Sequence, residues 1–365
     1  MAEELRNIFN QGFIDELSKE LKIAYPSFDQ AKFQKSVYAG EWNEYTLKQR
    51  VRRISECFHV TIDLEFPDVI RILKEVAPHF QGSLAGIIFP DYIEVYGLHN
   101  WDVSIAALEY FTQYSTSEFA VRPFVIKDQE KMMNQFLSWS RHTNEHVRRL
   151  ASEGSRPRLP WGIVLTSLKN DPSPILPILG NLKEDPSLYV RKSVANNIND
   201  ISKDHPAIVL SLAQKWKEKN ELTDWILKKG LRTLLKKGNL EALELFGLGA
   251  VKKIDLINLD VTKNVFIGDT ISFSFQLVSA DAQQRKVRVE YSIDFIKANG
   301  KPSSKLFQLS EITIKPGEKK QYVKKHSFKD LSTRKHYPGK HVLSIIVNGE
   351  VKGKSVFEVH SHTEK

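Results

Sequence analysis

Cysteine is almost absent from this sequence, which has 365 residues and one cysteine, Cys57. A single thiol excludes an intramolecular disulfide framework and a thiolate zinc site. Long apolar runs are also missing, because no stretch approaches the roughly 20 residues that a membrane-spanning helix needs. The acidic start, Met1-Ala2-Glu3-Glu4, has no apolar segment typical of a signal peptide. These absences predict a cytoplasmic protein without a membrane partner.

The common motifs of nucleotide and metal chemistry are missing too. The sequence has no GxxxxGK[ST] loop, no GxGxxG turn and no GxSxG elbow. His142 and His146 are four residues apart, but Glu145 is adjacent to the second histidine and no third ligand follows at a recognisable spacing. We interpret this pair as a solvated or DNA-facing helix surface. We therefore expect neither a metal ion nor a nucleotide cofactor.

Positive charge is concentrated in the last third of the chain. The net charge is +9, and residues 258–365 hold 19 Lys and Arg against 11 Asp and Glu, which is eight of the nine surplus charges. A polyanion, nucleic acid first and acidic lipid second, is the obvious partner for such a module. A solubilising surface explains the same composition equally well. Composition alone therefore does not distinguish a polyanion-binding module from a solubilising surface.

Residues 1–253 show helical periodicity that repeats along the chain. The segment 144–149 aligns with 187–192 and more loosely with 225–232, which spaces Val147, Val190 and Leu227 by 43 and 37 residues. That spacing suits the roughly 40-residue period of HEAT-like helix pairs. We expect an α-solenoid with one concave face.

Residues 258–361 change to a period of two. Apolar and polar residues alternate in 271–277 and 287–293, and Asn348-Gly349 between two such runs is a strong hairpin signal. About seven short strands in roughly 100 residues favour an immunoglobulin-like β-sandwich. The predicted fold is therefore multidomain, with an all-α solenoid followed by an all-β module, and any chemistry is expected in the solenoid.

The densest polar cluster of the solenoid surrounds Glu153. The helix must end near Gly154, where the helix dipole disfavours a carboxylate, so Glu153 needs a nearby cation or a function. Arg149 or Arg156 could supply the cation. Glu118 and Asp200 have similar settings, but Glu118 could simply pair with the arginine four residues later, and Asp200 could cap a turn. A ladder of ion pairs between repeats explains each arginine as well as contact with a ligand does.

Several segments together resemble the AlkC branch of the HEAT-like-repeat alkylbase DNA glycosylases. The resemblance covers roughly residues 1–250 and is carried by five segments of the sequence: EFAVRPF at 118–124, RLASEG at 149–154, RPRLPW at 156–161, DPSLYVRKSVANN at 185–197, and KGLRTLLKKG at 229–238. A C-terminal immunoglobulin-like domain occurs in part of that branch. No single segment is specific, but the combination is.

The resemblance implies a monofunctional glycosylase that excises cationic methylated bases, namely 3-methyladenine, 3-methylcytosine and 1-methyladenine, without flipping the base. Glu153 would stabilise the sugar cation and orient water, with Glu118 and Asp200 supporting it. Trp161 would pack against the lesion. The residues expected to contact DNA are Arg148, Arg149, Arg156, Arg158, Arg191, Lys192, Asn196 and Asn197, together with Lys324, Lys325 and Lys335 of the sandwich.

The partner implied is double-stranded DNA, bound by a monomer associated with the bacterial nucleoid. The competing interpretation is a non-catalytic scaffold, because many HEAT-like solenoids bind proteins or DNA without catalysis. Three acids among arginines argue against a pure DNA clamp, which gains nothing from carboxylates.

Overall fold

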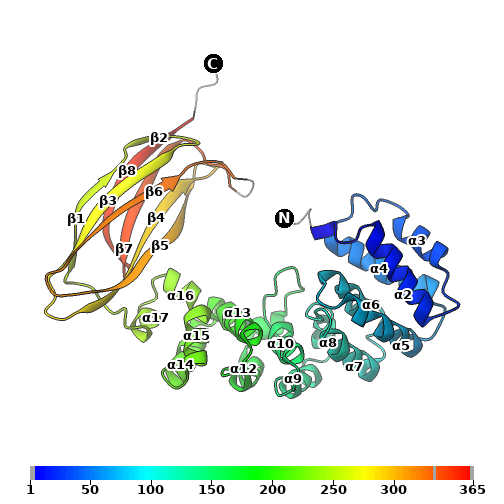
Figure 1. Cartoon of the computed structure of the whole chain (residues 1–365). Helices are drawn as coiled ribbons and strands as arrows, with labels where there is room; N and C mark the ends of the chain where they lie inside the picture. Colours follow the sequence, from blue (N-terminus) through cyan, green and yellow to red (C-terminus); the bar gives the residue numbers. More distant parts are fainter. Residues whose placement is uncertain (1–4, 332–333, 362–365) are drawn as a thin grey trace. The chain divides into compact units, whose positions relative to one another are not determined.

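A computed structural model describes residues 5–331 and 334–361 (Figure 1). The chain forms two compact units. The first extends to Val209 and includes Trp216–Gly230, and the second consists of Leu210–Lys215 and the chain from Leu231 onward. Across the described residues, none of the helices combines the length and the apolar character that a bilayer crossing requires.

The regular structure described in the first unit is helical. Its elements are α2 (Gln11–Ala24), α3 (Gln30–Tyr38), α4 (Leu47–Thr61), α5 (Phe66–Val76), η1 (Ala77–Phe80), η2 (Leu84–Ile87), α6 (Ile88–Tyr96), α7 (Trp101–Phe111), α8 (Arg122–Lys127), α9 (Gln129–Trp139), α10 (Glu145–Gly154), α11 (Thr166–Asn170), η3 (Ser173–Ile175), α12 (Leu176–Leu182), α13 (Leu188–Asp204) and α15 (Glu221–Gly230). α14 (Pro206–Trp216) has residues in both units.

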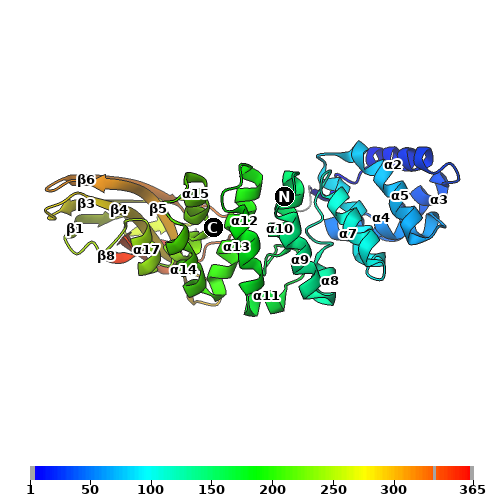
Figure 2. The same cartoon turned by 90° about the horizontal axis from the view of Figure 1, so that it is seen from below.

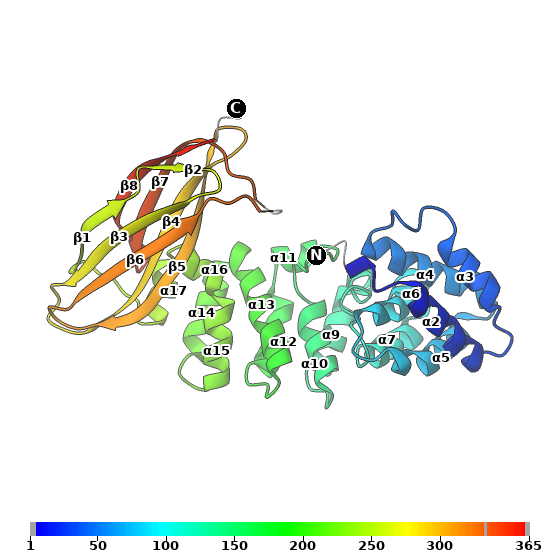
Figure 3. The ribbon, with the colours of Figure 1, turned by 45° about the horizontal axis from the view of Figure 1, so that its top comes forward.

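The helices stack as repeated pairs. α9 packs on α10 and α12 on α13, while α10, α13 and α15 follow one another side by side (Figures 2 and 3). The three positions aligned in the sequence, Val147, Val190 and Leu227, fall on these three helices, and each is at most 1% exposed. A buried apolar residue at the same place in each repeat fills the contact between neighbouring repeats. The predicted solenoid of HEAT-like repeats is confirmed.

Polar caps set where the site-bearing helices begin. The Asn144 side chain accepts a hydrogen bond from the His146 amide at the start of α10. Ser187 does the same for the Val190 amide at the start of α13, directly after Pro186. Such caps satisfy amides that have no partner within the helix. Ser187 thus determines the first turn of α13, directly after Pro186.

The second unit is mainly a β-sandwich. Its elements are α16 (Arg232–Lys236), α17 (Leu240–Leu245), β1 (Ile254–Val261), β2 (Asn264–Phe266), β3 (Thr270–Ser279), β4 (Arg285–Ile296), β5 (Pro302–Ile314), β6 (Lys319–Ser327), β7 (Gly339–Val347) and β8 (Glu350–His360). One sheet has the strand order β1-β3-β6, and the other has the order β2-β8-β7-β4-β5. The predicted immunoglobulin-like sandwich is confirmed.

Alternation along the strands builds the core of the sandwich. In β3, Ile271, Phe273, Phe275 and Leu277 are buried, whereas the residues between them are only half-buried. The two faces of a strand alternate with a period of two, so these four side chains share the inner face. Every second residue of this strand therefore packs into the core between the two sheets.

The hairpin expected at Asn348-Gly349 joins β7 to β8. Both residues have positive φ, 48° and 78°. A two-residue type I′ turn needs this backbone at both central positions, and Asn-Gly adopts it most readily. The local sequence thus fixes the pairing of these two strands.

Candidate active site

Glu153 and Asp200 come from neighbouring helices of the solenoid. α10 and α13 pack against each other. Glu153 is the second-last residue of α10, and Asp200 lies in the last turn or so of α13. Glu118 lies in the turn that precedes α8. The side chains of Glu118, Glu153 and Asp200 are 13%, 7% and 3% exposed. The structure brings together, in one buried ion-pair network, the three acids that the sequence indicated.

Gly154 allows the end of α10 to approach its neighbours. A Cβ at this position would lie 2.8 Å from Val121 Cγ2 and 2.9 Å from Phe136 Cζ, closer than real contacts allow. Because glycine has no side chain, the last turn of α10 can pack directly against these residues. Because Val121 follows Glu118 by three residues, this close packing brings the end of α10 next to the turn that carries Glu118.

Arg156 joins two of the acids. Its Nη1 lies 2.5 Å from Glu153 Oε1, and its Nη2 lies 2.7 Å from Asp200 Oδ2. Burial would lower the pKa of Arg156, but the Glu153 and Asp200 carboxylates outweigh it and raise that pKa. Lys203 adds a second cation 2.8 Å from Asp200. The buried carboxylates are therefore paired, as groups in such surroundings must be.

Arg149 joins Glu118 to the same network. Its guanidinium pairs with Glu118 and lies 3.7 Å from Glu153 Oε1. Burial opposes the charge of Arg149, but Glu153 and Glu118 raise its pKa above the usual value. Ser193 Oγ donates a hydrogen bond of 2.5 Å to Glu153 Oε2. Both oxygens of Glu153 thus accept hydrogen bonds from fixed donors, and a carboxylate still has lone pairs for a further donor.

Arg122 lies behind the acids and is fully buried. It donates hydrogen bonds to the carbonyl oxygens of Gly154, Arg156 and Ile163, while its Nη2 has no partner. Burial, followed by repulsion from Arg156, lowers the pKa of Arg122 to about 10. Arg122 therefore ties the end of α10 to the loop that carries Trp161. Pairing of Glu118 with Arg122, one of the two readings of the sequence, is replaced by pairing with Arg149.

A pocket of about 270 Å³ opens onto two of the acids. Glu118, Glu153, Arg156 and Trp161 are among its lining residues, together with Leu47, Lys48, Leu84, Ile87, Thr116, Phe119, Leu159 and Pro160. Trp161 is 63% exposed and has a φ of 64°, an uncommon backbone for a bulky residue. An exposed aromatic ring beside buried carboxylates can pack against a sugar or base while the acids act on it.

Lys48 of α4 closes one side of this pocket. Its ammonium group donates a hydrogen bond to the Trp161 carbonyl and lies 4.5 Å from the centre of the Phe119 ring. No sequence pattern indicates this residue, because 113 positions separate Lys48 from Trp161. Ser193 was missed for the same reason, since it contacts Glu153 only through the packing of α10 on α13.

The remaining polar residues expected to contact DNA have different surroundings. Arg148 pairs with Asp185 at 2.6 Å, and Arg158 pairs with Asp204 at 2.7 Å. Both pairs join neighbouring repeats. This is the arrangement expected of a ladder of ion pairs between repeats, one of the two explanations of these arginines. Arg191 donates to the carbonyl oxygens of Asp185 and Pro186, and Asn197 is buried and donates to the Ser152 carbonyl oxygen. Lys192 is exposed and Asn196 half-buried on α13.

The three lysines of the second unit that are expected to contact DNA are exposed. Lys324 and Lys325 lie on β6, which is an edge strand of the three-stranded sheet, and Lys335 lies in the segment before β7. Neighbouring side chains of a strand point to opposite faces, so Lys324 and Lys325 cover both sides of this edge. The structure thus presents a basic edge on the sandwich.

The fold and site together define an α-solenoid of HEAT-like repeats that carries a carboxylate–arginine site and an immunoglobulin-like domain. Residues 256–361 match a family model described as the C-terminal Ig-like domain of the uncharacterised protein YhaZ. The chain is 52% identical to the uncharacterized protein YhaZ of Bacillus subtilis (strain 168), over 98% of this chain and 99% of that protein.

A solved structure matches the whole architecture. It is the Pseudomonas fluorescens alkylpurine DNA glycosylase AlkC bound to DNA containing an abasic site analog, with a TM-score of 0.94 and 41% identity. The match covers 98% of this chain and 99% of the other. The chain therefore belongs to the AlkC family of DNA glycosylases, and it is an enzyme of that class.

Proposed function

We propose that this enzyme is a monofunctional glycosylase that releases cationic N-methylated bases, namely 3-methyladenine, 3-methylcytosine and 1-methyladenine, from double-stranded DNA. The observation that carries this proposal is the network of Glu118, Glu153 and Asp200 tied together by two arginines beside an exposed tryptophan. The alkylpurine DNA glycosylase AlkC, similar over nearly the full length, supports the same class of substrate.

The chemistry requires a carboxylate more than a proton donor. When the bond between C1′ and the base nitrogen breaks, the electron pair leaves with the base and neutralises its positive charge. The sugar becomes an oxocarbenium-like cation, which a fixed anion stabilises. Water then adds to C1′ and gives up a proton to a carboxylate. A cationic base is a good leaving group without protonation, so no strong general acid is needed.

Glu153 has the principal role in this scheme. It lines the pocket, and its two oxygens are oriented by Arg156 and Ser193. Glu118 lines the same pocket and supports the sugar cation. Asp200, on α13, holds Arg156 in place and so acts on the reaction indirectly, by positioning the arginine that orients Glu153. Fixed donors of this kind remove the cost of reorganising the site during the reaction.

The enzyme is proposed to act on the sugar without swinging the base into a sealed pocket. Trp161 would pack against the lesion nucleotide from its exposed position at the pocket. Lys192 and Asn196 would contact the backbone, as would the outer edges of the arginines on α10 and α13. Lys324, Lys325 and Lys335 would add contacts to phosphates from the sandwich, which would anchor a monomer on nucleoid DNA.

Hydrolysis is favoured over a covalent lysine mechanism. Lys48 is the lysine among the residues that line the pocket, and its ammonium group is engaged by the Trp161 carbonyl and the Phe119 ring. A lysine held by these two contacts is not positioned as a free nucleophile toward C1′. Borohydride should therefore trap no covalent adduct between the enzyme and abasic DNA.

The direct test is release of free base from methylated duplex DNA by the purified full chain. Chromatography should detect 3-methyladenine, and the DNA should keep an abasic site without strand cleavage. If the protein binds methylated DNA but releases no base, the competing function of a non-catalytic DNA-binding scaffold is the better description.

A further inference from the structure

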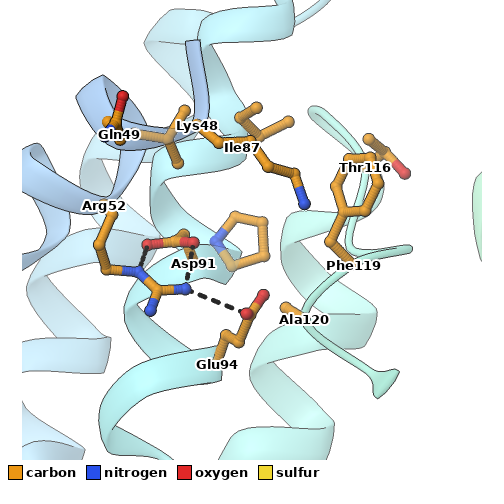
Figure 4. Close-up of a pocket in the computed structure, with 11 residues that line it drawn as sticks. Lys48, Gln49, Arg52, Ile87, Asp91, Glu94, Thr116, Phe119 and Ala120 are labelled. Carbon is orange, nitrogen blue, oxygen red and sulfur yellow. Dashed lines mark hydrogen bonds and ion pairs between the residues drawn. The ribbon is translucent and has the colours of Figure 1, made fainter. Parts of the chain in front are cut away.

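A second pocket lies beside the one that contains Glu118 and Glu153. It has a volume of about 240 Å³ and is formed largely by α4, α6 and the turn before α8 (Figure 4). The two pockets share four lining residues: Lys48, Ile87, Thr116 and Phe119. These shared side chains form a thin partition between the proposed site of bond cleavage and the second pocket.

One end of the second pocket is acidic. Asp91 and Glu94 of α6 share a single cation, Arg52 of α4, at 2.9 Å and 3.0 Å (Figure 4). Burial, together with repulsion from Asp91, raises the pKa of Glu94 above its usual value. Two carboxylates with one guanidinium leave acceptor capacity that a ligand with N–H groups would use.

Away from the acids the pocket wall is largely apolar. The Phe119 ring and the Ile87 side chain line it (Figure 4), and Pro90 is a further apolar lining residue of the pocket. The volume lies below the roughly 300–1,000 Å³ of sites for drug-sized molecules, so the pocket suits a small ligand. A flat ring with an amino group at one edge satisfies both the aromatic wall and the acidic end.

We propose that this second pocket binds the free methylated base after it has been cut from the DNA. This inference rests on the proposed function, which supplies a flat heterocycle with an exocyclic amino group on the other side of the partition. The amino group would donate to Glu94 or Asp91, and the ring would pack against Phe119. Rotation of the Lys48 side chain, whose stem is flexible, would open the way between the pockets.

Binding of the free base can be measured without DNA. The experiment titrates 3-methyladenine into the full-length protein by isothermal calorimetry, with 1,3-dimethyluracil as a flat ligand that lacks N–H donors. We expect 3-methyladenine to bind and 1,3-dimethyluracil to bind at least tenfold more weakly. Equal affinities, or no binding of 3-methyladenine, would overturn the proposal.

Glu94→Met tests the acidic end, because it leaves Arg52 and Asp91 as a balanced pair. It should weaken binding of 3-methyladenine at least tenfold. Glu75→Met is the matched control, since Glu75 is a 53% exposed acid in a surface ion pair on α5, and it should leave binding unchanged. Should Glu94→Met lose its fold by circular dichroism, Phe119→Ala tests the opposite wall and should weaken binding as strongly. Unchanged affinity in a folded variant of either wall contradicts the proposal.

Base release from methylated DNA, measured on the same samples, separates this inference from the proposed function. A protein that releases base but does not bind it free contradicts the second pocket alone. A protein that binds the free base but releases none from DNA contradicts the proposed function and leaves binding in this pocket standing.

Discussion

Glu153 and Asp200 are joined through one guanidinium across the contact between two repeats. Arg156 lies 2.5 Å from the first and 2.7 Å from the second. Each acid is at most 7% exposed, so solvent screens little of its charge. The arginine therefore fixes the proposed catalytic group and the contact between the two repeats at the same time.

Replacing Arg156 should be costly for stability. Arg156→Met leaves two buried carboxylates without their shared cation, and breaking a buried pair in this way costs about 3–5 kcal/mol. The control is Arg158→Met, whose pair with Asp204 is 38% and 25% exposed; an exposed pair contributes at most about 1 kcal/mol. Urea unfolding monitored by circular dichroism compares the two variants. Equal losses of unfolding free energy in the two variants would show that the buried Arg156 pairs stabilise the fold no more than the exposed Arg158 pair does.

Adding one methyl group at Gly154 should damage both stability and activity. In Gly154→Ala the new Cβ meets Val121 and Phe136 at 2.8 Å and 2.9 Å, so the end of α10 must shift and move Glu153 with it. We expect a loss of about 1–3 kcal/mol, typical of overpacking. Gly180→Ala on α12 is the control, since its Cβ would meet nothing within 4 Å; it should be neutral or slightly stabilising. Thermal melting and base-release rates of the two variants test this prediction, and equal behaviour of Gly154→Ala and Gly180→Ala would contradict it.

The sandwich should lose stability in acid through His326. Burial, with repulsion from His336 and Lys324, lowers the pKa of His326 from 6.5 to about 4. The unfolded chain therefore binds the proton more readily than the folded one. The stabilisation is complete above about pH 6.5 and is lost as the pH falls toward 4.

His326→Gln tests this dependence. The variant keeps a polar group near the Tyr291 hydroxyl, which lies 2.9 Å from His326 Nδ1. Thermal melting between pH 7.5 and pH 4 should show a smaller loss of stability in this variant than in the wild type. Gln in place of the exposed His99 should leave the pH profile as it is. Identical profiles for all three proteins would remove His326 as the cause.

The basic edge of the sandwich should contribute to DNA affinity in a salt-dependent way. Each lysine that neutralises a phosphate adds roughly 0.9 to the slope of log affinity against log salt. Lys324→Gln with Lys325→Gln should therefore weaken binding at low salt and reduce the slope by up to about 2. Fluorescence anisotropy with duplex DNA at several salt concentrations gives both values. An unchanged slope would mean that this edge does not contact phosphates.

The local features of the site were predictable from the sequence, and the long-range ones were not. The end of α10 at Gly154 and the cations beside Glu153 follow from local sequence, because Arg149 lies four residues before Glu153 in the helix and Arg156 three residues after it, just past the helix end. The bond from Arg156 to Asp200 spans 44 residues, and its partners depend on how repeats pack. Pairing Glu118 with the nearest arginine in sequence was therefore one option among several, and packing selected Arg149.

The same division holds for the fold. Repeats and alternation predicted a solenoid and a sandwich of about seven strands, and the described residues contain eight. β2 spans only Asn264–Phe266 and pairs in parallel with β8. Three residues are too few to show a period of two, so such a strand is recognised only from its partner.

The central claim is that Glu153 performs the chemistry. The measurement that tests it most directly is the single-turnover rate of 3-methyladenine release from methylated duplex DNA by wild type and Glu153→Gln. The variant keeps the size of the side chain and one acceptor oxygen but removes its charge. We predict a fall in rate of about 100-fold or more, the range for losing one group that stabilises transition-state charge, with DNA affinity changed less than threefold. A rate equal to that of the wild type, in a variant that folds and binds DNA normally, would contradict the role assigned to Glu153.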